Sequence, residues 1–355
     1  MPVKRRLLLT VLLGAAAAGA LVLLVGKVTS YGRLSESLNG AAWPWLALSG
    51  LGLALAFGGY VLGYREVARV DGGPRLGYRA AARVVATSIG AFAVTSAGGP
   101  AVEYWSLHRA GATRNDAITR VLALNALKFF VLGVAAAIAS LFVLVGAGSG
   151  ISPAYTLPWL VGVPIVTVLA VWLSSSRRLP REPAPAPAEC GQRAFERCLR
   201  YLVRVGLRDA IAGVGYVRHL LARPRAHAGG VVAFPLYWAG QVLALYGGVR
   251  AFGGAPGLAG IVLAFAVGYL ATILPLPAGG SGGVEASMSY ALSAVGVALA
   301  PALLGVLAYR VVTFWLPLLP VVAVLPSFRR LDGELLSARE QAAASEVSPA
   351  SPSFG

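Results

Sequence analysis

Long apolar runs separated by short, arginine-rich polar segments dominate the chain. A run of about 20 apolar residues is long enough to cross a bilayer as a helix. We predict uninterrupted membrane helices over residues 7–28, 43–64, 118–145, 157–174, 231–249 and 302–325. The first of these is longer than the apolar core of a signal peptide, so we expect an uncleaved helix. The pattern predicts an all-α polytopic membrane protein.

Two further apolar stretches are interrupted by glycine and proline. Residues 84–113 are broken at 96–100, and residues 258–300 are broken at 275–283. Such clusters permit a reversal of the chain and close backbone approach. Non-helical backbone at membrane depth is tolerated only inside protein or beside a wet cavity. We therefore predict two broken, re-entrant helical hairpins.

The distribution of basic residues predicts the orientation of these elements. Basic residues gather before the first helix, in the loop 65–83, in the segment 175–230 and at Arg329-Arg330. Cytoplasmic loops carry an excess of Lys and Arg, so both termini are expected in the cytoplasm. Both flanks of the first hairpin are basic, which predicts that it opens inward. By parity the second hairpin opens outward.

Opposite openings predict inverted-topology repeats, an arrangement typical of transporters. Residues 1–330 then form one membrane domain, with one half at about 7–174 and the other at about 231–327. The basic segment 175–230 is either an interfacial amphipathic helix or a solvated connector. The polar tail 331–355 is expected to be disordered.

Composition agrees with a membrane protein and argues against other classes. The chain has 355 residues, of which 57% are hydrophobic and 12% are charged. Its net charge of +16 follows from the basic loops, so we expect no nucleic-acid partner. The cysteines and histidines lack the spacing of metal ligands. Because the sequence also lacks a nucleotide-binding loop and a nucleophile elbow, we predict no catalytic residue, metal or cofactor.

One small pattern occurs in both halves. Ala97-Gly98-Gly99 precedes Glu103, and Ala278-Gly279-Gly280 precedes Glu285. A basic residue follows each glutamate after the same interval of 25 residues. Ionisable residues inside membrane segments are rare and usually functional. The candidate substrate-binding residues are therefore Glu285, Arg310, Glu103, Lys128, Gly279, Gly280, Gly282, Gly283, Gly98 and Gly99.

The residues after each glycine cluster resemble the start of a helix. Pro100 suits a first helical position, and Ser281 is a candidate cap. Free N–H groups at such helix starts favour anions, including a lipid phosphate. Glu103 and Glu285 are then expected in the first turn of each half-helix.

Each glutamate has a structural and a functional interpretation. It complements the helix dipole or pairs with Lys128 or Arg310, because a buried charge must be neutralised. Alternatively it accepts a proton or meets a cationic headgroup, while the bases contact lipid phosphate. Both interpretations stay open.

Several other polar residues have weaker claims to the site. Gln241 and Asn125 are expected to bridge helices. A further group fits either headgroup contact or ordinary anchoring on the basic side. It consists of Arg83, His108, Arg109 and Arg120.

The second-half motif resembles a known family. Residues 276–286, followed by Tyr309-Arg310, are similar to the lysylphosphatidylglycerol synthase transmembrane-region family, a flippase-like domain. The resemblance covers about residues 7–327 and implies a bacterial cytoplasmic-membrane protein that translocates a phospholipid or polyprenyl lipid. The first-half counterpart departs from the family pattern. We therefore favour Glu285 and Arg310 over Glu103 and Lys128 as substrate-binding residues. Only a short tail follows the last helix, so lysyltransferase activity is not expected.

Three functions remain open from the sequence. The first is a lipid transporter or flippase, with membrane lipids as partners and with homo-oligomers possible. The second is a membrane-embedded transferase that acts on a polyprenyl-phosphate lipid, with Glu285 as base. The third is a non-catalytic assembly or regulatory subunit that acts through the basic segment 175–225.

Overall fold

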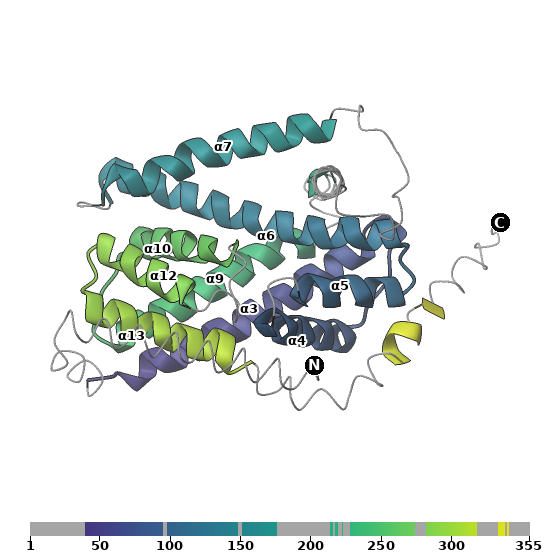
Figure 1. Ribbon diagram of the computed structural model, residues 1–355, viewed down its shortest axis with the longest axis horizontal. Helices are drawn as coiled ribbons and strands as arrows, with labels where there is room; N and C mark the ends of the chain where they lie inside the picture. Colours follow the sequence, from purple (N-terminus) through teal and green to yellow (C-terminus); the bar gives the residue numbers. More distant parts are fainter. Residues whose placement is uncertain are drawn as a thin grey trace, which may run out of the picture.

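The computed structural model describes most of the chain between residues 40 and 317. The described residues are 40–94, 98–147, 151–175, 214–215, 217–218, 222, 228–273, 282–317, 333–337 and 339–340. Within them every regular element is helical (Figure 1). The predicted helix at 7–28 and most of the basic segment 175–230 lie outside the described residues.

The described helices follow the apolar pattern, but the one predicted over 302–325 is α-helical only to Arg310, continues as a π-helical turn over Val311–Trp315, and lies outside the described residues from 318 on. They are α3 (Trp43–Arg69), α4 (Tyr78–Val94), α5 (Gly98–Arg109), α6 (Arg114–Phe142), α7 (Pro153–Ser175), α9 (Ala228–Ala251), α10 (Leu258–Leu270), α12 (Gly283–Ala294) and α13 (Leu299–Arg310). Among them, α3, α6, α7 and α9 are long and apolar enough to cross a membrane. The chain is therefore a helical, multi-pass membrane protein.

The two glycine-rich breaks separate pairs of short helices. α4 packs against α5, and α10 packs against α12 (Figure 1). Residues 95–97 and 274–281, which include parts of both predicted breaks, lie outside the described residues, and residues 98–100 of the first predicted break are helical. α5 begins at Gly98, two residues earlier than expected. Pro100 is thus the third helical residue, where the missing N–H still removes no intrahelical hydrogen bond.

The contact between α3 and α9 forms the centre of the molecule and depends on small residues. A Cβ atom added to Gly52 would lie 2.6 Å from the Gly240 carbonyl oxygen, and one added to Gly240 would lie 2.6 Å from that of Gly52. Gly59 approaches Tyr237 of α9 equally closely. Small residues permit such close packing of membrane helices. This glycine pattern was not among the sequence-based predictions.

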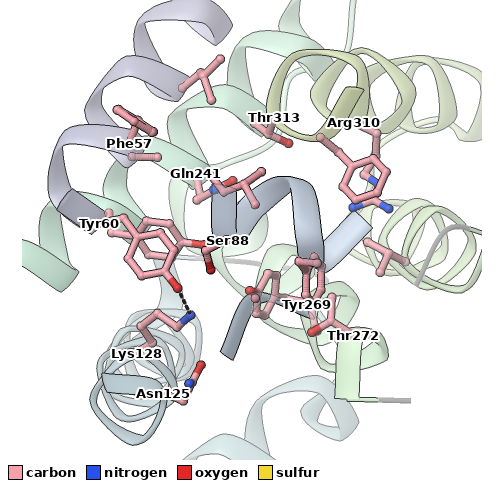
Figure 2. Close-up of a pocket in the computed structure, with 18 of the residues that line it drawn as sticks. Phe57, Tyr60, Ser88, Asn125, Lys128, Gln241, Tyr269, Thr272, Arg310 and Thr313 are labelled. Atoms are coloured by element: carbon pink, nitrogen blue, oxygen red, sulfur yellow. Dashed lines mark hydrogen bonds between the residues drawn. The ribbon is translucent and has the colours of Figure 1, made fainter. Parts of the chain in front are cut away.

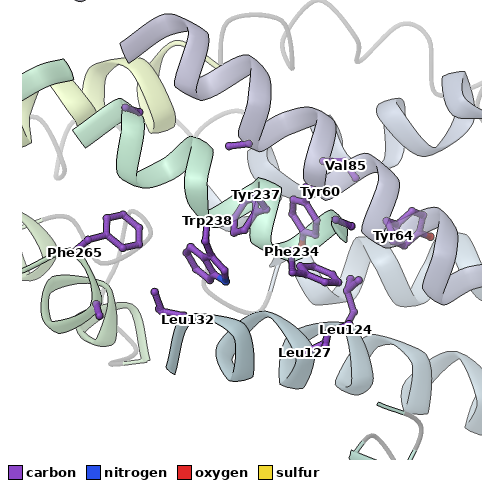
Figure 3. Close-up of a cluster of buried hydrophobic side chains, with 14 of the residues drawn as sticks. Tyr60, Tyr64, Val85, Leu124, Leu127, Leu132, Phe234, Tyr237, Trp238 and Phe265 are labelled. Carbon is purple, nitrogen blue, oxygen red and sulfur yellow. The ribbon is translucent and has the colours of Figure 1, made fainter. Parts of the chain in front are cut away.

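Aromatic side chains fill the space beside the α3–α9 contact. Figure 3 shows Tyr60 and Tyr64 of α3 near Phe234 and Trp238 of α9, with leucines of α6 completing the cluster. α7 lies at the periphery beside α6, and much of its apolar surface is exposed, as expected of a helix that faces lipid (Figure 1). The hydrophobic core thus joins α3, α6 and α9.

The tail is not wholly disordered, which corrects the prediction for part of it. Residues 333–337 are helical, Leu335 is fully buried in the main hydrophobic cluster, and Glu334 forms an ion pair with Arg83 of α4. Average composition misses this contact because one leucine and one glutamate provide it. The tail therefore docks on the first half.

Candidate functional site

A cavity of about 360 Å³ lies between the helices of both halves. Its wall includes residues of α3, α4, α5 and α6 and also of α9, α10, α12 and α13 (Figure 2). Aromatic rings supply much of this wall: Phe57, Tyr60, Phe92, Phe129, Tyr237, Tyr269, Tyr309 and Phe314. Hydroxyl and amide side chains add polar groups: Ser88, Asn125, Gln241, Thr272 and Thr313. The cavity can thus hold a partly polar ligand.

Both predicted basic residues line this single cavity. Figure 2 shows Lys128 of α6 and Arg310 of α13 on different sides of it. Their side chains are nearly buried, with Lys128 9% and Arg310 6% exposed. Both also lie close to aromatic rings, Lys128 over Tyr60 and Arg310 over Phe314. The structure therefore brings together two cations that are 182 positions apart in the sequence.

Glu285 forms a direct ion pair behind the Arg310 side of the cavity. Arg310 Nε donates to Glu285 Oε1 at 2.8 Å, and the Gly282 N–H donates to Oε2 at 2.6 Å. Gly282 has a φ of 87°, which glycine adopts without strain. Glu285 lies in the first turn of α12, as predicted, and both of its oxygens have partners.

Glu103 has a different position and different partners. It lies in the second turn of α5, so its predicted place in the first turn is wrong, because α5 already begins at Gly98. Its Oε1 accepts hydrogen bonds from the Tyr60 hydroxyl and, at 3.0 Å, from Ser88. Its Oε2 has no hydrogen-bond partner among the described residues. A polar pocket within the protein, and not a helix start, holds this carboxylate.

Direct pairing of Glu103 with Lys128, one of the interpretations left open by the sequence, does not occur in the structure. Lys128 Nζ donates to the Tyr60 hydroxyl at 3.2 Å, so the phenol connects the base to the carboxylate (Figure 2). Within the described part of the chain, Glu103 and Lys128 form no ion pair. Trp238 fixes the backbone of Lys128 by donating to its carbonyl oxygen at 2.7 Å. The first half therefore contains a carboxylate–phenol–ammonium chain.

Two of the predicted glycines, Gly98 and Gly99, lie in close packing contacts. A Cβ atom on Gly98 would lie 2.1 Å from the Ala91 carbonyl oxygen, and one on Gly99 would lie 3.1 Å from Ser88 Oγ. Gly99 lines the cavity, and Gly283 begins α12. Gly279, Gly280 and the proposed cap Ser281 lie outside the described residues.

Tyr60 is the main site residue that the sequence analysis missed. Tyr60 and Tyr64 are one helical turn apart, and the Tyr64 hydroxyl lies 2.5 Å from Ser106 Oγ on α5. Two tyrosines at this spacing in an apolar helix indicate a hydroxyl-bearing face, and this signal was available in the sequence. Ser88, on α4, was missed as well.

The weaker candidates contact other protein groups, and two of them, Gln241 and Asn125, also line the cavity. Tyr309 donates to Gln241 at 2.8 Å, which confirms the predicted interhelical bond, whereas Asn125 Nδ2 donates to Val121 of its own helix. The Arg120 guanidinium is buried and binds the Val67 and Ala68 carbonyl oxygens near the end of α3. His108 contacts the Ala112 carbonyl oxygen. The described lining of the cavity includes none of the four residues Arg83, His108, Arg109 and Arg120.

A comparison with known families gives one result. The family model for the lysylphosphatidylglycerol synthase TM region matches residues 8–320. No curated protein sequence matches the chain.

Proposed function

The chain belongs to the lysylphosphatidylglycerol synthase TM region family, and we propose that it is a lipid transporter or flippase that moves a phospholipid or polyprenyl-linked lipid across the membrane. The observation that carries this proposal is the single cavity that Lys128 and Arg310 line from different halves of the molecule. In transporters built from repeats, substrate sites lie between the repeats near the midplane.

Element order supports an inverted repeat. α3, α4, α5 and α6 are a long helix, two short packed helices and a helix that carries the base. α9, α10, α12 and α13 repeat this order. In our proposal α4–α5 and α10–α12 are re-entrant hairpins that open to opposite sides of a bacterial cytoplasmic membrane, with both termini in the cytoplasm. The basic loops that follow α3 support this orientation.

In the proposed transport step the headgroup occupies the cavity while the acyl chains stay in the bilayer. The cavity volume of about 360 Å³ is within the usual range of small-molecule sites. Lys128 and Arg310 bind the phosphate, and the aromatic wall shields it from hydrocarbon. Glu285 holds Arg310 directly, whereas Glu103 binds the Tyr60 hydroxyl, which in turn accepts from Lys128. Movement of the short hairpins then exposes the headgroup to either side.

We propose no catalytic role for the site. A transferase that used Glu285 as a base would need a carboxylate oxygen that faces the substrate. Both oxygens of Glu285 are instead hydrogen-bonded to protein groups, and Glu285 is not among the lining residues. The segment on which a regulatory function would depend, residues 175–225, lies largely outside the described residues.

Reconstitution tests the transport proposal. Proteoliposomes would contain acyl-labelled anionic, zwitterionic, aminoacylated and polyprenyl lipids, and loss of signal from the outer leaflet would measure translocation. We expect protein-dependent translocation of at least one of these lipids, and a strong reduction in Lys128→Gln. Arg79→Gln is a matched control because it removes an exposed positive charge of α4 that does not line the cavity. Folded protein that moves none of the lipids would contradict the proposal.

A further inference from the structure

The charges around the cavity point to the kind of lipid that it binds. We propose, on the basis of the transport function above, that the site selects a phosphate-bearing anionic headgroup with hydroxyl groups and discriminates against headgroups that carry an amine. Lys128 would contact the phosphate, and the amide and hydroxyl side chains of the wall would contact the hydroxyl groups.

The charged side chains that line the cavity are positive. The described lining contains Lys128 and Arg310 and contains no carboxylate. Residues 95–97 and 274–281, which lie outside the described residues, contain no ionisable side chain. A cation in this space would approach Lys128, whose described partner is a neutral hydroxyl, in a medium that screens charge poorly, which disfavours its binding. An anion there would gain mainly from Lys128, because Glu285 already offsets the charge of Arg310.

The nearby carboxylates are engaged elsewhere. Glu285 uses both oxygens for Arg310 and the Gly282 N–H. Glu103 uses Oε1 for Tyr60 and Ser88, and its Oε2 is inaccessible to solvent. Both side chains are 1% exposed. An amine in the cavity would therefore lack a carboxylate partner.

Lys128 and Arg310 differ in their hydrogen-bond partners. An ammonium group has three N–H donors. Among the described residues, Lys128 Nζ has one hydrogen-bond acceptor, the Tyr60 hydroxyl. Arg310 Nε already binds Glu285, and its guanidinium lies 4.3 Å from the centre of the Phe314 ring. Lys128 is thus the cation with spare donors, and phosphate oxygens would satisfy them.

The neutral side chains of the cavity wall suit the rest of the headgroup. Neutral polar side chains stand around the cavity: Ser88, Asn125, Gln241, Thr272 and Thr313. The three hydroxyls and the Asn125 amide each donate one hydrogen bond to a protein oxygen, so their oxygen acceptors and the Gln241 amide N–H groups would meet a ligand. Such groups bind the hydroxyls of a glycerol or a sugar without adding charge. Between them lie aromatic rings, which suit the apolar faces of those headgroups. The wall therefore fits a phosphodiester with a polyol.

Binding and transport must be measured separately to test this inference. Purified full-length protein in detergent would be titrated with phosphatidylglycerol, phosphatidylethanolamine and lysylphosphatidylglycerol. The same three lipids, labelled on an acyl chain, would be used in proteoliposomes of phosphatidylcholine. We expect phosphatidylglycerol to bind at least about tenfold more tightly than lysylphosphatidylglycerol. Translocation should follow the same order.

Three variants locate the source of the preference. Lys128→Gln should weaken phosphatidylglycerol binding about tenfold or more, whereas Lys128→Arg should retain most of it. Asn125→Asp adds a carboxylate of nearly the same shape to the lining and should shift the preference toward lysylphosphatidylglycerol. Arg79→Gln should change neither quantity. Asn125→Asp keeps the test valid even if Lys128→Gln does not fold.

The outcomes separate the two proposals. Equal or tighter binding of lysylphosphatidylglycerol overturns the inference, and so does an Asn125→Asp variant with unchanged preference. Selective binding without translocation of any lipid supports the inference and contradicts the transport function. Translocation without selectivity supports transport and overturns the inference.

Discussion

The two halves of this protein place a glutamate and a base at the same interval but connect them differently. In the second half, Arg310 contacts Glu285 directly at 2.8 Å. In the first half, the Tyr60 hydroxyl lies between Glu103 and Lys128. Both glutamates are buried, so both arrangements must compensate for removing a carboxylate from water.

The difference shows how one motif can serve two purposes. The direct pair satisfies both oxygens of Glu285 and fixes the first turn of α12. The relayed arrangement leaves Lys128 with a neutral partner and holds Glu103 with neutral donors. We infer that the Glu285–Arg310 pair mainly holds the site together and that Lys128 mainly meets the substrate. This inference differs from the sequence-based expectation, which favoured the second pair for binding and stays a prediction.

Breaking the direct pair should have the largest effect. Glu285→Gln leaves Arg310 buried without a carboxylate, and loss of one partner of a buried pair costs about 3–5 kcal/mol. Thermal and denaturant unfolding in detergent would measure this loss. The double variant Glu285→Gln/Arg310→Met should recover much of the stability, because it removes both charges. A single variant as stable as the unmodified protein would show that the pair does not hold the site together.

Adding a side chain at the contact between α3 and α9 should lower the stability of both halves equally. A Cβ atom in Gly52→Ala would lie 2.6 Å from backbone atoms of Gly240 and Ala244, and such overpacking costs about 1–3 kcal/mol. Gly50→Ala is the matched control, since a Cβ there meets nothing within 4 Å. Unfolding would separate the two variants. Equal stabilities would contradict the close packing of these helices.

Removing the phenol that connects Glu103 and Lys128 should have a moderate and local effect. Tyr60→Phe takes one hydrogen-bond partner from each of these buried groups, and we expect a loss of about 1–3 kcal/mol. Binding of anionic lipid should change along with stability, because Lys128 loses the contact that positions it. The exposed Tyr78→Phe is the control. If Tyr60→Phe changed neither stability nor binding, the relay would have no role.

Releasing the tail should have the smallest effect and should be confined to the first half. The Arg83–Glu334 pair is partly exposed, so Glu334→Gln is expected to cost about 0–1 kcal/mol. Hydrogen–deuterium exchange should increase in α4 and remain unchanged in α10. The exposed Glu340→Gln is the control. Increased exchange in both halves would show that the tail stabilises more than the hairpin it contacts.

Much of the architecture follows from the sequence alone. Runs of apolar residues predicted α3, α6, α7 and α9, because backbone in hydrocarbon must satisfy its own hydrogen bonds and a helix does so locally. The glycine cluster predicted an interruption within residues 84–113, and the structure has two helices there, although Gly98 and Gly99 themselves belong to the second one, α5. Glu103, Lys128, Glu285 and Arg310 could be selected as candidate site residues from the sequence as well, because charges are rare at membrane depth. Each of these is a local property.

Only the tertiary structure decided which groups these residues contact. Tyr60 is 43 positions from Glu103 and 68 positions from Lys128, and it reaches both because α3 presents that face to α5 and α6. The equal spacing of Glu103–Lys128 and Glu285–Arg310 does not show which face of α3 points toward these residues. The sequence therefore determined that two carboxylates and two cations enter the membrane domain. Packing of helices distant in sequence decided that both cations line one cavity while both carboxylates lie behind it.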